Sequence, residues 1–398
     1  MRIQPRSEQT GKVEVITNRS LVWKLIERRF EENDLQSLLD LLRSSYDGWH
    51  DVQYWMWKYK KNPHGSPAIW VAEDKGRIVG CYILNPARIR IGRVSLLGAQ
   101  SVDAAVDDAY RGVGIFKKLA VKAIAQATKE GVAIIFAFPT EIAYKGQVRI
   151  GYRPMFILPK MFKIFRPSSL LEEQGPRSAF LKKALGMIKM SQRIDRTENN
   201  TKSDDGLKVV ETKEFDSRFE TFWHKVCKEN ESILVERDRA YLGWRYRDHP
   251  ENQYTTYMCE KNGEVVGYIV ISVQKDMSME RGRKGRLSIG NIIDLLTLPN
   301  MTNSAFPLIS ASVANFKHEN VDIARSWMFR RYPYHAILRK FGFHERYELL
   351  RRVVFRPKYN AQFICHVNSK AAIQEATKMM PKRSKPSWFI MQGDSDYM

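Results

Sequence analysis

The sequence predicts an α+β fold with a central mixed sheet, built twice along the chain. Three observations support this prediction. The chain has 398 residues, which is too long for one ordinary core. A set of landmarks recurs in the same order in both halves. Within the first half, strand-like segments are interspersed with segments of helical period. Hydrophobic residues make up 43 % of the chain, so a sizeable core can be buried.

The repeat is defined by four landmarks. Trp57–Pro63 (WKYKKNP) resembles Trp244–Pro250 (WRYRDHP), and the turn Gly76–Gly80 resembles Gly263–Gly267. A Gly-aromatic pair and a Phe-Arg-Pro triplet then recur in the same order, as Gly151-Tyr152 with Gly342-Phe343 and as Phe165–Pro167 with Phe355–Pro357. Four landmarks in one order indicate a duplicated domain.

The spacing of these landmarks predicts the domain boundaries. We expect a first domain over residues 12–167, a connecting segment over 168–208, a second domain over 209–360 and a C-terminal extension over 361–398. The connecting segment begins with a basic, helix-like stretch, Ser178–Met190, and then becomes polar, as is typical of a flexible linker.

The elements of the first domain follow from local patterns. Leucines at helical spacing predict a helix over 30–45, and a turn glycine, Gly76, separates two strands of a hairpin over 69–73 and 78–84. Next come an extended segment over 95–106, a helix over 114–129 that stops at Gly131, a buried strand over 132–138, a short helix over 141–149, and a basic hairpin that begins at Gly151.

A glycine-containing turn, Arg111-Gly112-Val113-Gly114-Ile115-Phe116, joins the extended segment to the second of these helices. Such a turn directs several backbone N–H groups toward one point, and the helix dipole adds positive charge there. Gly112 and Gly114 would let phosphates approach the backbone without a Cβ in the way, and Arg111 could add a charge-assisted hydrogen bond. Taken alone, the turn predicts either a pyrophosphate cradle or an ordinary helix start.

With this turn, residues 29–167 resemble the GNAT superfamily of N-acetyltransferases, whose signature is Q/R-x-x-G-x-G/A between the fourth strand and the third helix. Arg111, Gly114 and Phe116 occupy the three signature positions. Phe116 departs from the pattern, and we expect its ring to crowd one side of the cradle. The resemblance implies acetyl-CoA as co-substrate and no metal. The implied contacts are the turn residues Arg111, Gly112, Val113, Gly114, Ile115 and Phe116 and the strand residues Val102, Ala104 and Val106.

The second half resembles the same fold over residues 211–357 but carries no such signature. Asn-Met-Thr-Asn at 300–303 stands where the phosphate turn is expected, so we expect this copy to have lost coenzyme binding. The doubled architecture is similar to that of the tandem acetyltransferases, among them the enhanced-intracellular-survival type and mycothiol synthase, and to that of the peptidoglycan-bridge aminoacyl transferases. This similarity implies one coenzyme site, with the second domain shaping the acceptor cleft.

Acetyl transfer from a thioester requires an oxyanion donor, a base for the amine and, in many enzymes, an acid for the leaving thiolate. The resemblance implies that a backbone N–H near Asp103–Val106 is the oxyanion donor and that a tyrosine after the fifth strand is the acid, a position that Tyr144 matches. Asp103 and Glu141 are candidate bases. The alternatives left open are the C-terminal carboxylate of Met398, the nearby Asp394 and Asp396, and water.

Charge, cysteine spacing and apolar content indicate which partners and which cellular compartment to expect. The net charge of +21 favours anionic partners such as coenzyme A, nucleotide-linked sugars, nucleic acid or anionic lipid. The four cysteines form no C-x-x-C pair and have no histidine at zinc-ligand spacing, so we expect reduced thiols. The longest apolar stretch, residues 132–138, is too short to span a bilayer, and the N-terminus lacks the apolar core of a secretory signal. We therefore expect a cytoplasmic protein.

These observations together predict an N-acetyltransferase. We expect direct attack by the primary amine of a small molecule on acetyl-CoA in a ternary complex, with an amino sugar or a nucleotide-linked sugar as the acceptor class. Two alternatives remain open: a non-catalytic protein of this fold that binds nucleic acid or an anionic surface, although no nucleic-acid-binding motif supports it, and an aminoacyl transferase of the peptidoglycan-bridge kind. The oligomeric state does not follow from the sequence.

Overall fold

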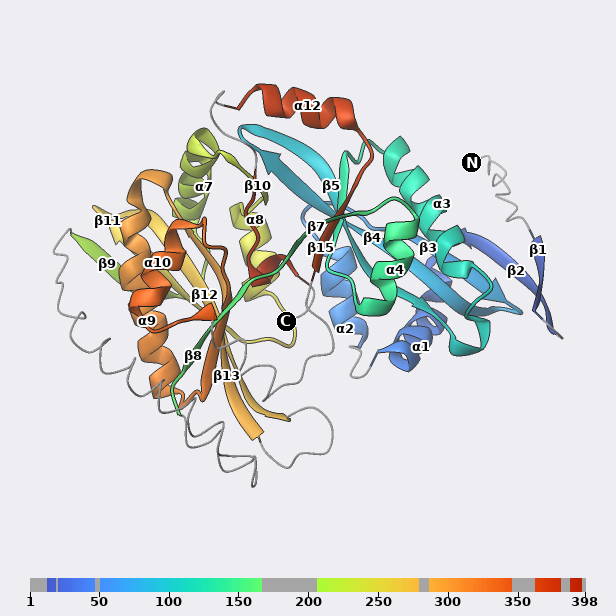
Figure 1. Cartoon of the computed structure of the whole chain (residues 1–398), viewed down its shortest axis with the longest axis horizontal. Coiled ribbons are helices and arrows are strands. Elements are labelled where there is room, and N and C mark those ends of the chain that lie inside the picture. The colour runs from blue at the N-terminus through green and yellow to red at the C-terminus, as the bar shows by residue number, and fades with distance from the viewer. Residues whose placement is uncertain are drawn as a thin grey trace, which may run out of the picture. The chain divides into compact units, whose positions relative to one another are not determined.

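The computed structural model describes residues 13–18, 21–46, 51–166, 206–278, 286–345, 362–380 and 387–395 (Figure 1). They belong to two compact units that interleave along the chain. The first comprises Met1–Arg88, Leu96–Met155 and Phe363–Ile373, and the second comprises Ile89–Ser95, Phe156–Gln362 and Gln374–Met398. This division differs from the consecutive domains that the sequence predicts, with boundaries at 167 and 361. Most of the predicted connecting segment, including Ser178–Met190, lies outside the described residues.

The first unit is built on a mixed sheet with the strand order β1-β2-β3-β4-β5-β6-β15-β7. Strands β5 and β6 run parallel, whereas β3 and β4 form the antiparallel hairpin predicted around Gly76. The bounds are β1 Val13–Asn18, β2 Leu21–Arg29, β3 Ala68–Asp74, β4 Arg77–Ile91, β5 Val94–Val106, β6 Ile134–Ala137, β7 Arg153–Ile157 and β15 Gln362–Val367.

Helices cover both faces of this sheet, so the first unit has three layers (Figure 1). On one face, α1 (Leu35–Ser45) and the turn that follows α2 (Val52–Trp55) pack on the sheet. That turn is a π-helical segment, Met56–Lys60, labelled η2. On the other face lies α3 (Ile115–Lys129), with Tyr144 of α4 (Glu141–Arg149) packed against the same cluster. The apolar spacing of α1 and α3 explains this burial, because each helix presents one apolar stripe to the sheet.

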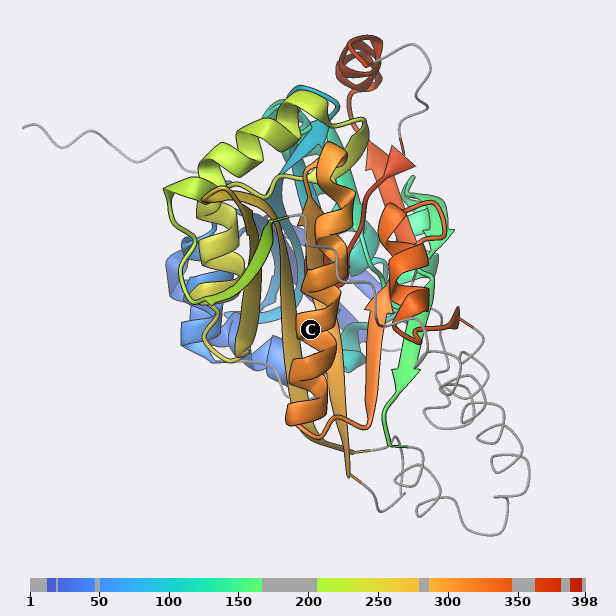
Figure 2. The same ribbon diagram turned by 90° about the vertical axis from the view of Figure 1, so that its left-hand side faces the viewer.

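The second unit repeats this plan. Its sheet has the order β8-β14-β13-β12-β11-β9, with β13 and β14 parallel, and α9 lies across one face (Figure 2). The strands are β8 Lys160–Ile164, β9 Leu207–Thr212, β11 Tyr254–Lys261, β12 Glu264–Ser278, β13 Arg286–Thr297 and β14 Ile323–Trp327. The helices are α7 Ser217–Glu229, α8 Arg239–Leu242 with its π-helical turn η5 Gly243–Arg247, α9 Ala305–His318 and α10 Pro333–Lys340. The matching order of elements supports the duplication.

Three further elements complete the set of described strands and α-helices. Strand β10 (Ser232–Val235) pairs with Ile89–Ile91 at the end of β4 and, in parallel, with β16 (Ser387–Trp388). Helix α12 spans Lys370–Lys378. No described helix has the length and apolar character needed to cross a membrane.

The prediction that a basic hairpin begins at Gly151 is wrong. Strand β7 pairs with β15, whereas β8 pairs antiparallel with β14 in the second sheet, where Lys163 faces Ala324. In turn β15, which follows the second repeat in the sequence, pairs antiparallel with β6, where Ile364 faces Ala137. The residue pattern predicts β7 and β8 as strands, but it contains no information about which sheet each one joins, and it did not predict β15 within the C-terminal extension.

Candidate active site

The candidate site begins where two parallel strands part. Strands β5 and β6 pair from Gly98 with Ile134 to Gln100 with Phe136, after which β5 continues to Val106. Among the described residues, no strand pairs with β5 on this side beyond Gln100. This side of β5 can therefore meet a ligand that lies alongside it, although the carbonyls of Asp103 and Ala104 already accept hydrogen bonds from side chains.

The turn that follows β5 is held by side chains. The carboxylate of Asp107 accepts the N–H of Ala109 at 2.9 Å and caps a short 3₁₀ helix, η3 (Asp108–Tyr110). The Tyr110 hydroxyl donates to Asp74 at the end of β3 at 2.7 Å, and Arg77 on β4 forms an ion pair with Asp107 at 3.1 Å. The β3–β4 hairpin thus fixes the position from which Arg111–Gly114 enters α3.

The start of α3 has the features of an anion site. Gly112 and Gly114 have φ values of +85° and +88°, which L side chains rarely adopt, and a Cβ at either position would meet no atom within 4 Å. Gly114 is the N-cap and no side chain caps the helix, so the first N–H groups are open to a ligand. The half-exposed Arg111 lies beside this turn, in an ion pair with Asp108 at 2.6 Å.

The ring of Phe116 lies against α4 and not over Gly112 and Gly114. Its ring packs edge-on to Tyr82, with centroids 5.4 Å apart, and rests on Gly146 of α4, where a Cβ would lie 2.8 Å from the ring. The expectation that Phe116 crowds the cradle is therefore not met. A glycine on α4 provides the space that glycine or alanine provides at the signature position.

Asp103 interrupts the regular alternation of β5. It has a positive φ of 45°, and around it the side chains change faces. Val102 and Ala105 pack in the core under α1, whereas Ala104 and Val106 pack against the core of α3. The sequence places Val102, Ala104 and Val106 together along the coenzyme. The structure separates Val102 from the other two, because an irregular residue shifts the two-residue period of a strand.

The carboxylate of Asp103 is engaged by buried partners. It accepts hydrogen bonds from Lys58 Nζ at 2.7 Å and from the Tyr59 hydroxyl, and the Lys58 side chain is only 2 % exposed. The Asp103 carbonyl accepts from Cys81 Sγ, and the next carbonyl, that of Ala104, accepts from the Tyr46 hydroxyl at 2.8 Å. Oδ2 of Asp103 thus already accepts two hydrogen bonds from side chains of η2. The geometry favours a role for Asp103 in holding the irregular strand rather than in proton transfer.

The other two predicted catalytic residues lie on α4, which begins at a cap formed by the Thr140 hydroxyl and the Ala143 N–H. Tyr144 packs half-buried against the core of α3, and its hydroxyl makes no hydrogen bond with another described residue. Glu141 is exposed in the first turn of the helix, where its charge favours the helix dipole. Both side chains therefore retain free polar groups near the end of β6.

The C-terminal candidates divide into two groups. Asp394 is buried in the second unit, where Arg237 donates to both of its carboxylate oxygens, at 2.7 and 2.9 Å. Burial raises the pKa of Asp394, but both of its oxygens are engaged by Arg237 and are out of reach of an amine in solution. Asp396 and Met398 lie outside the described residues.

A buried polar network at the point of parting was not predicted. Ser101 is the first residue of β5 beyond the last pair, and its hydroxyl donates to the Tyr82 hydroxyl at 2.9 Å. Gln147 of α4 donates its side-chain N–H to the Ser101 hydroxyl at 3.0 Å, and Tyr82 shares a hydrogen bond with Tyr152 at 3.0 Å. Burial raises the pKa of both tyrosines, so they are neutral. The only sequence signal was the Gly151-Tyr152 landmark.

The corresponding turn of the second repeat is shorter and lacks glycine. The Asp107 N–H donates to Val79, and in the second repeat the Leu298 N–H donates to the matching carbonyl of Val266. Tyr110 and Met301 each lie three residues after these matched N–H groups. At the far end of the turn, Ile115 packs on Gly80 and Ser304 packs on Gly267, so these two residues also correspond. Four residues (111–114) lie between the matched ends in the first repeat and two (302–303) in the second. This turn therefore lacks both the length and the two glycines of positive φ that open the first.

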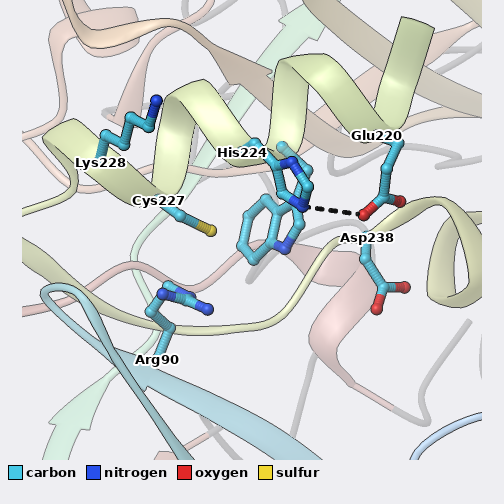
Figure 3. Close-up of a pocket in the computed structure, with 7 residues that line it drawn as sticks. Arg90, Glu220, His224, Cys227, Lys228 and Asp238 are labelled. Atoms are coloured by element: carbon cyan, nitrogen blue, oxygen red, sulfur yellow. Dashed lines mark ion pairs between the residues drawn. The ribbon is translucent and has the colours of Figure 1, made fainter. Parts of the chain in front are cut away.

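The second unit also contains a surface pocket of about 410 Å³, shown in Figure 3. It mixes cations with carboxylates, and His224 Nε2 lies 3.2 Å from Glu220 Oε1. Its walls are Arg90, Glu220, Trp223, His224, Cys227, Lys228 and Asp238. None of the residues predicted for the coenzyme site lines this pocket.

Comparisons with known proteins agree with this fold. A family model for the acetyltransferase (GNAT) domain matches residues 27–155. A GCN5-related N-acetyltransferase from Anabaena variabilis has 13 % identity and a TM-score of 0.59, and the match covers 88 % of this chain and 75 % of that one. A probable N-acyltransferase from Enterococcus faecalis has 11 % identity and a TM-score of 0.56, covering 89 % and 74 %. A tandem GNAT protein from the clavulanic acid biosynthesis pathway has 13 % identity and a TM-score of 0.51, covering 87 % and 99 %. No curated protein matches the chain.

Proposed function

We propose that this chain, an acyltransferase with the tandem GNAT fold and a GNAT domain as its first repeat, transfers an acetyl group from acetyl-CoA to the primary amine of a small molecule. The observation that carries the proposal is the open turn at Gly112 and Gly114. It leads into a helix that no described side chain caps, directly after a strand whose edge beyond Gln100 pairs with no other described strand. These are the features that a pyrophosphate and an extended thioester arm require.

Each residue of the site then has a role. The N–H groups at the start of α3, with Arg111, hold the pyrophosphate. The free edge of β5 near Ala104 and Val106 aligns the arm, and one of its N–H groups polarises the thioester carbonyl. Tyr144 donates a proton to the departing thiolate, and Glu141 or water accepts the proton of the amine. Asp103 fixes the irregular strand through Lys58 and Tyr59.

The acceptor class is the finer part of the proposal. The net charge of +21 favours an acceptor that carries negative charge, and a nucleotide-linked amino sugar combines phosphates with a primary amine. An acetylation assay should compare free amino sugars with nucleotide-linked ones at two salt concentrations. We expect higher kcat/KM for the nucleotide-linked acceptors, with a preference that declines as salt screens the charges.

The coenzyme site is tested by Gly114→Asp, which places a carboxylate where the pyrophosphate would lie. The matched control is Gly131→Asp at the other end of α3, where φ is +83° and a Cβ likewise meets no atom within 4 Å. Isothermal titration calorimetry should show affinity for acetyl-CoA falling at least about 100-fold in Gly114→Asp and little in the control. If the wild-type protein does not bind acetyl-CoA, or if Gly114→Asp binds it normally, the proposed site is refuted.

A further inference from the structure

The second unit repeats the parting of strands that forms the candidate site of the first. Strands β13 and β14 pair in parallel from Ile289 with Ile323 to Ile292 with Ser326, and β13 then continues to Thr297. We call the space between this end of β13 and the segment leading into α10 the second wedge. By position in the fold, it corresponds to the place that the coenzyme would occupy in the first unit.

The C-terminal segment, residues 387–395, touches the β13 wall of the second wedge. Gly393 lies so close to Ile293 that an added Cβ would be 3.3 Å from the Ile293 side chain. Arg237 joins Asp394 of the segment to Asp294 of β13, with N–O distances of 2.7 and 3.0 Å. Ile293 and Asp294 are the first two residues of β13 beyond its last pair with β14.

The same segment also touches the opposite wall. The Tyr332 hydroxyl, at the start of α10, donates to the Trp388 carbonyl at 2.7 Å and accepts the Ile390 N–H at 2.8 Å. Arg331 donates to the same carbonyl at 2.9 Å. The ring of Phe389 packs on that of Tyr332 with centroids 4.8 Å apart. Contacts with both walls place the segment inside the second wedge.

Burial, strand pairing and paired charges hold the C-terminal segment, as they would hold a bound peptide. Its apolar run Trp388–Met391 is buried, and Trp388 belongs to β16, which pairs in parallel with β10. Arg245 donates to the carbonyls of Gly393 and Ser395 at 3.1 and 2.6 Å. Arg237, which is fully buried, has carboxylates on both sides, one from the wedge and one from the segment. Buried, fully paired charges of this kind impose a specific register.

We propose that the second repeat has converted its coenzyme cleft into a binding site for an extended peptide, and that residues 387–395 of this chain are its ligand. Three features provide recognition: burial of the apolar run Trp388–Met391, a contact with Tyr246 that leaves no room for a Cβ at Gly393, and Arg237 for the carboxylate of Asp394. The site does not depend on catalysis by the first repeat, so it goes beyond the proposed function.

The first test is hydrogen exchange on the intact wild-type protein, followed by mass spectrometry. The N–H groups of Ile390, Met391, Asp394 and Ser395 donate within the structure, to Tyr332, Asp394, Met391 and Gln392 in turn. We expect these amides to exchange at least about 1,000-fold more slowly than in an unstructured peptide, as core amides do. Exchange at the unprotected rate would refute the proposal.

The second test separates the ligand from its site. In full-length Gly393→Val the added side chain collides with Tyr246, so the segment should leave the wedge. A fluorescent synthetic peptide of residues 386–398 should then bind this variant at least about tenfold more tightly than it binds the wild type, whose site is filled. The same peptide carrying Gly393→Val should not bind. The matched control is full-length Gly263→Val, at a glycine of the same unit whose φ is +79° and around which space is open.

The outcomes are distinguishable. Equal peptide binding to wild type and Gly393→Val, or no binding to a variant that circular dichroism shows to be folded, would overturn the proposal. If Gly393→Val does not fold, the hydrogen-exchange result decides. Calorimetry with acetyl-CoA on the wild type reports separately on the first repeat: one bound molecule per chain is expected, and its absence would refute the proposed function without affecting the peptide site.

Discussion

In both repeats an aspartate of the long central strand accepts a hydrogen bond from the tyrosine of a π-helical turn. Tyr59 donates to Asp103 in the first repeat, and Tyr246 donates to Asp294 in the second. The cation beside the aspartate differs, being Lys58 in one and Arg237 in the other. Because the pair is present in the repeat that has no glycine turn, it belongs to the framework of the fold. Catalytic and framework carboxylates are therefore separable by comparing the two halves of one chain.

The repeats differ where a ligand would bind. The first has an open turn with two glycines at the start of α3, whereas the second has a turn that is two residues shorter and a wedge filled by the C-terminal segment. A duplicated fold can thus keep its core while its ligand site is rebuilt, because the core contacts lie within the sheet faces and the ligand contacts lie at the strand ends.

The largest expected effect concerns the two framework cations. Arg237→Met would leave two buried carboxylates without a cation, although Asp294 keeps the hydrogen bond from Tyr246 and Asp394 keeps that from the Met391 N–H. The free energy of unfolding should therefore fall by about 3–5 kcal/mol. Lys58→Met removes the partner of one carboxylate, Asp103, which keeps the Tyr59 hydrogen bond, so we expect about 2–3 kcal/mol. Urea unfolding followed by circular dichroism measures both. A larger loss in Lys58→Met than in Arg237→Met would contradict this ranking.

The assignment of Tyr144 as proton donor can be tested by comparison with His335. The two residues hold equivalent positions, because each lies seven residues before the glycine of the Gly-aromatic landmark. We expect Tyr144→Phe to lower kcat about 100-fold with little change in affinity for acetyl-CoA, because only the transfer of a proton is lost. His335→Phe, in the repeat without a coenzyme turn, should leave kcat within about twofold. Steady-state kinetics on both variants would sink the assignment if the two behaved alike.

Gly80 and Gly267 occupy equivalent positions in the two repeats, so alanine substitutions there compare how each repeat depends on its helix start. A Cβ at Gly80 would lie 2.7 Å from Ile115, the first residue of α3, and one at Gly267 would lie 2.9 Å from Ser304. Each substitution to alanine should reduce the free energy of unfolding by about 1–3 kcal/mol through overpacking. Only Gly80→Ala should also weaken acetyl-CoA binding, by roughly fivefold, because it displaces the start of α3. Calorimetry would contradict the model of one coenzyme site if Gly267→Ala weakened binding equally.

The smallest effect is a pH dependence at Cys81, which faces the backbone of Asp103. Burial raises the pKa of its thiol from 9.0 to about 12, so the fold favours the neutral thiol. The resulting stabilisation is complete below pH 9 and is lost as the pH rises toward 12. At pH 10.5 wild type should have lost up to about 2 kcal/mol that Cys81→Ala does not lose. Urea midpoints at pH 7, 9 and 10.5 check this, and parallel pH profiles for the two proteins would refute it.

The sequence predicts well what depends on neighbouring residues. The hairpin at Gly76, the turn of Gly112 and Gly114, and the end of α3 at Gly131 all follow from local patterns, and all three regions have glycines with positive φ. The sequence also predicts the duplication. The structure agrees at the Trp-x-Tyr landmark, because a π-helical turn forms at both copies.

What the sequence does not predict depends on distant partners. The irregularity at Asp103 is held by Lys58 and Tyr59, more than forty residues earlier, so strict alternation misplaces Val102. Phe116 fits because Gly146 lies under its ring. The C-terminal segment resembles an ordinary tail until Arg237 and Tyr332 are seen to bind it. No pattern within a strand or a tail records such partners.

The insertion of β15, from the C-terminal part of the chain, into the first sheet has a consequence for biosynthesis. The first unit includes Phe363–Ile373, and its sheet places β15 between β6 and β7. While the ribosome is translating the second repeat, the first lacks this strand, so β6 has an unsatisfied edge until residue 367 has left the exit tunnel. Nascent chains stalled before that point should recruit chaperones that recognise exposed strand edges, and a stop codon between the repeats would release an incomplete sheet rather than an independent domain.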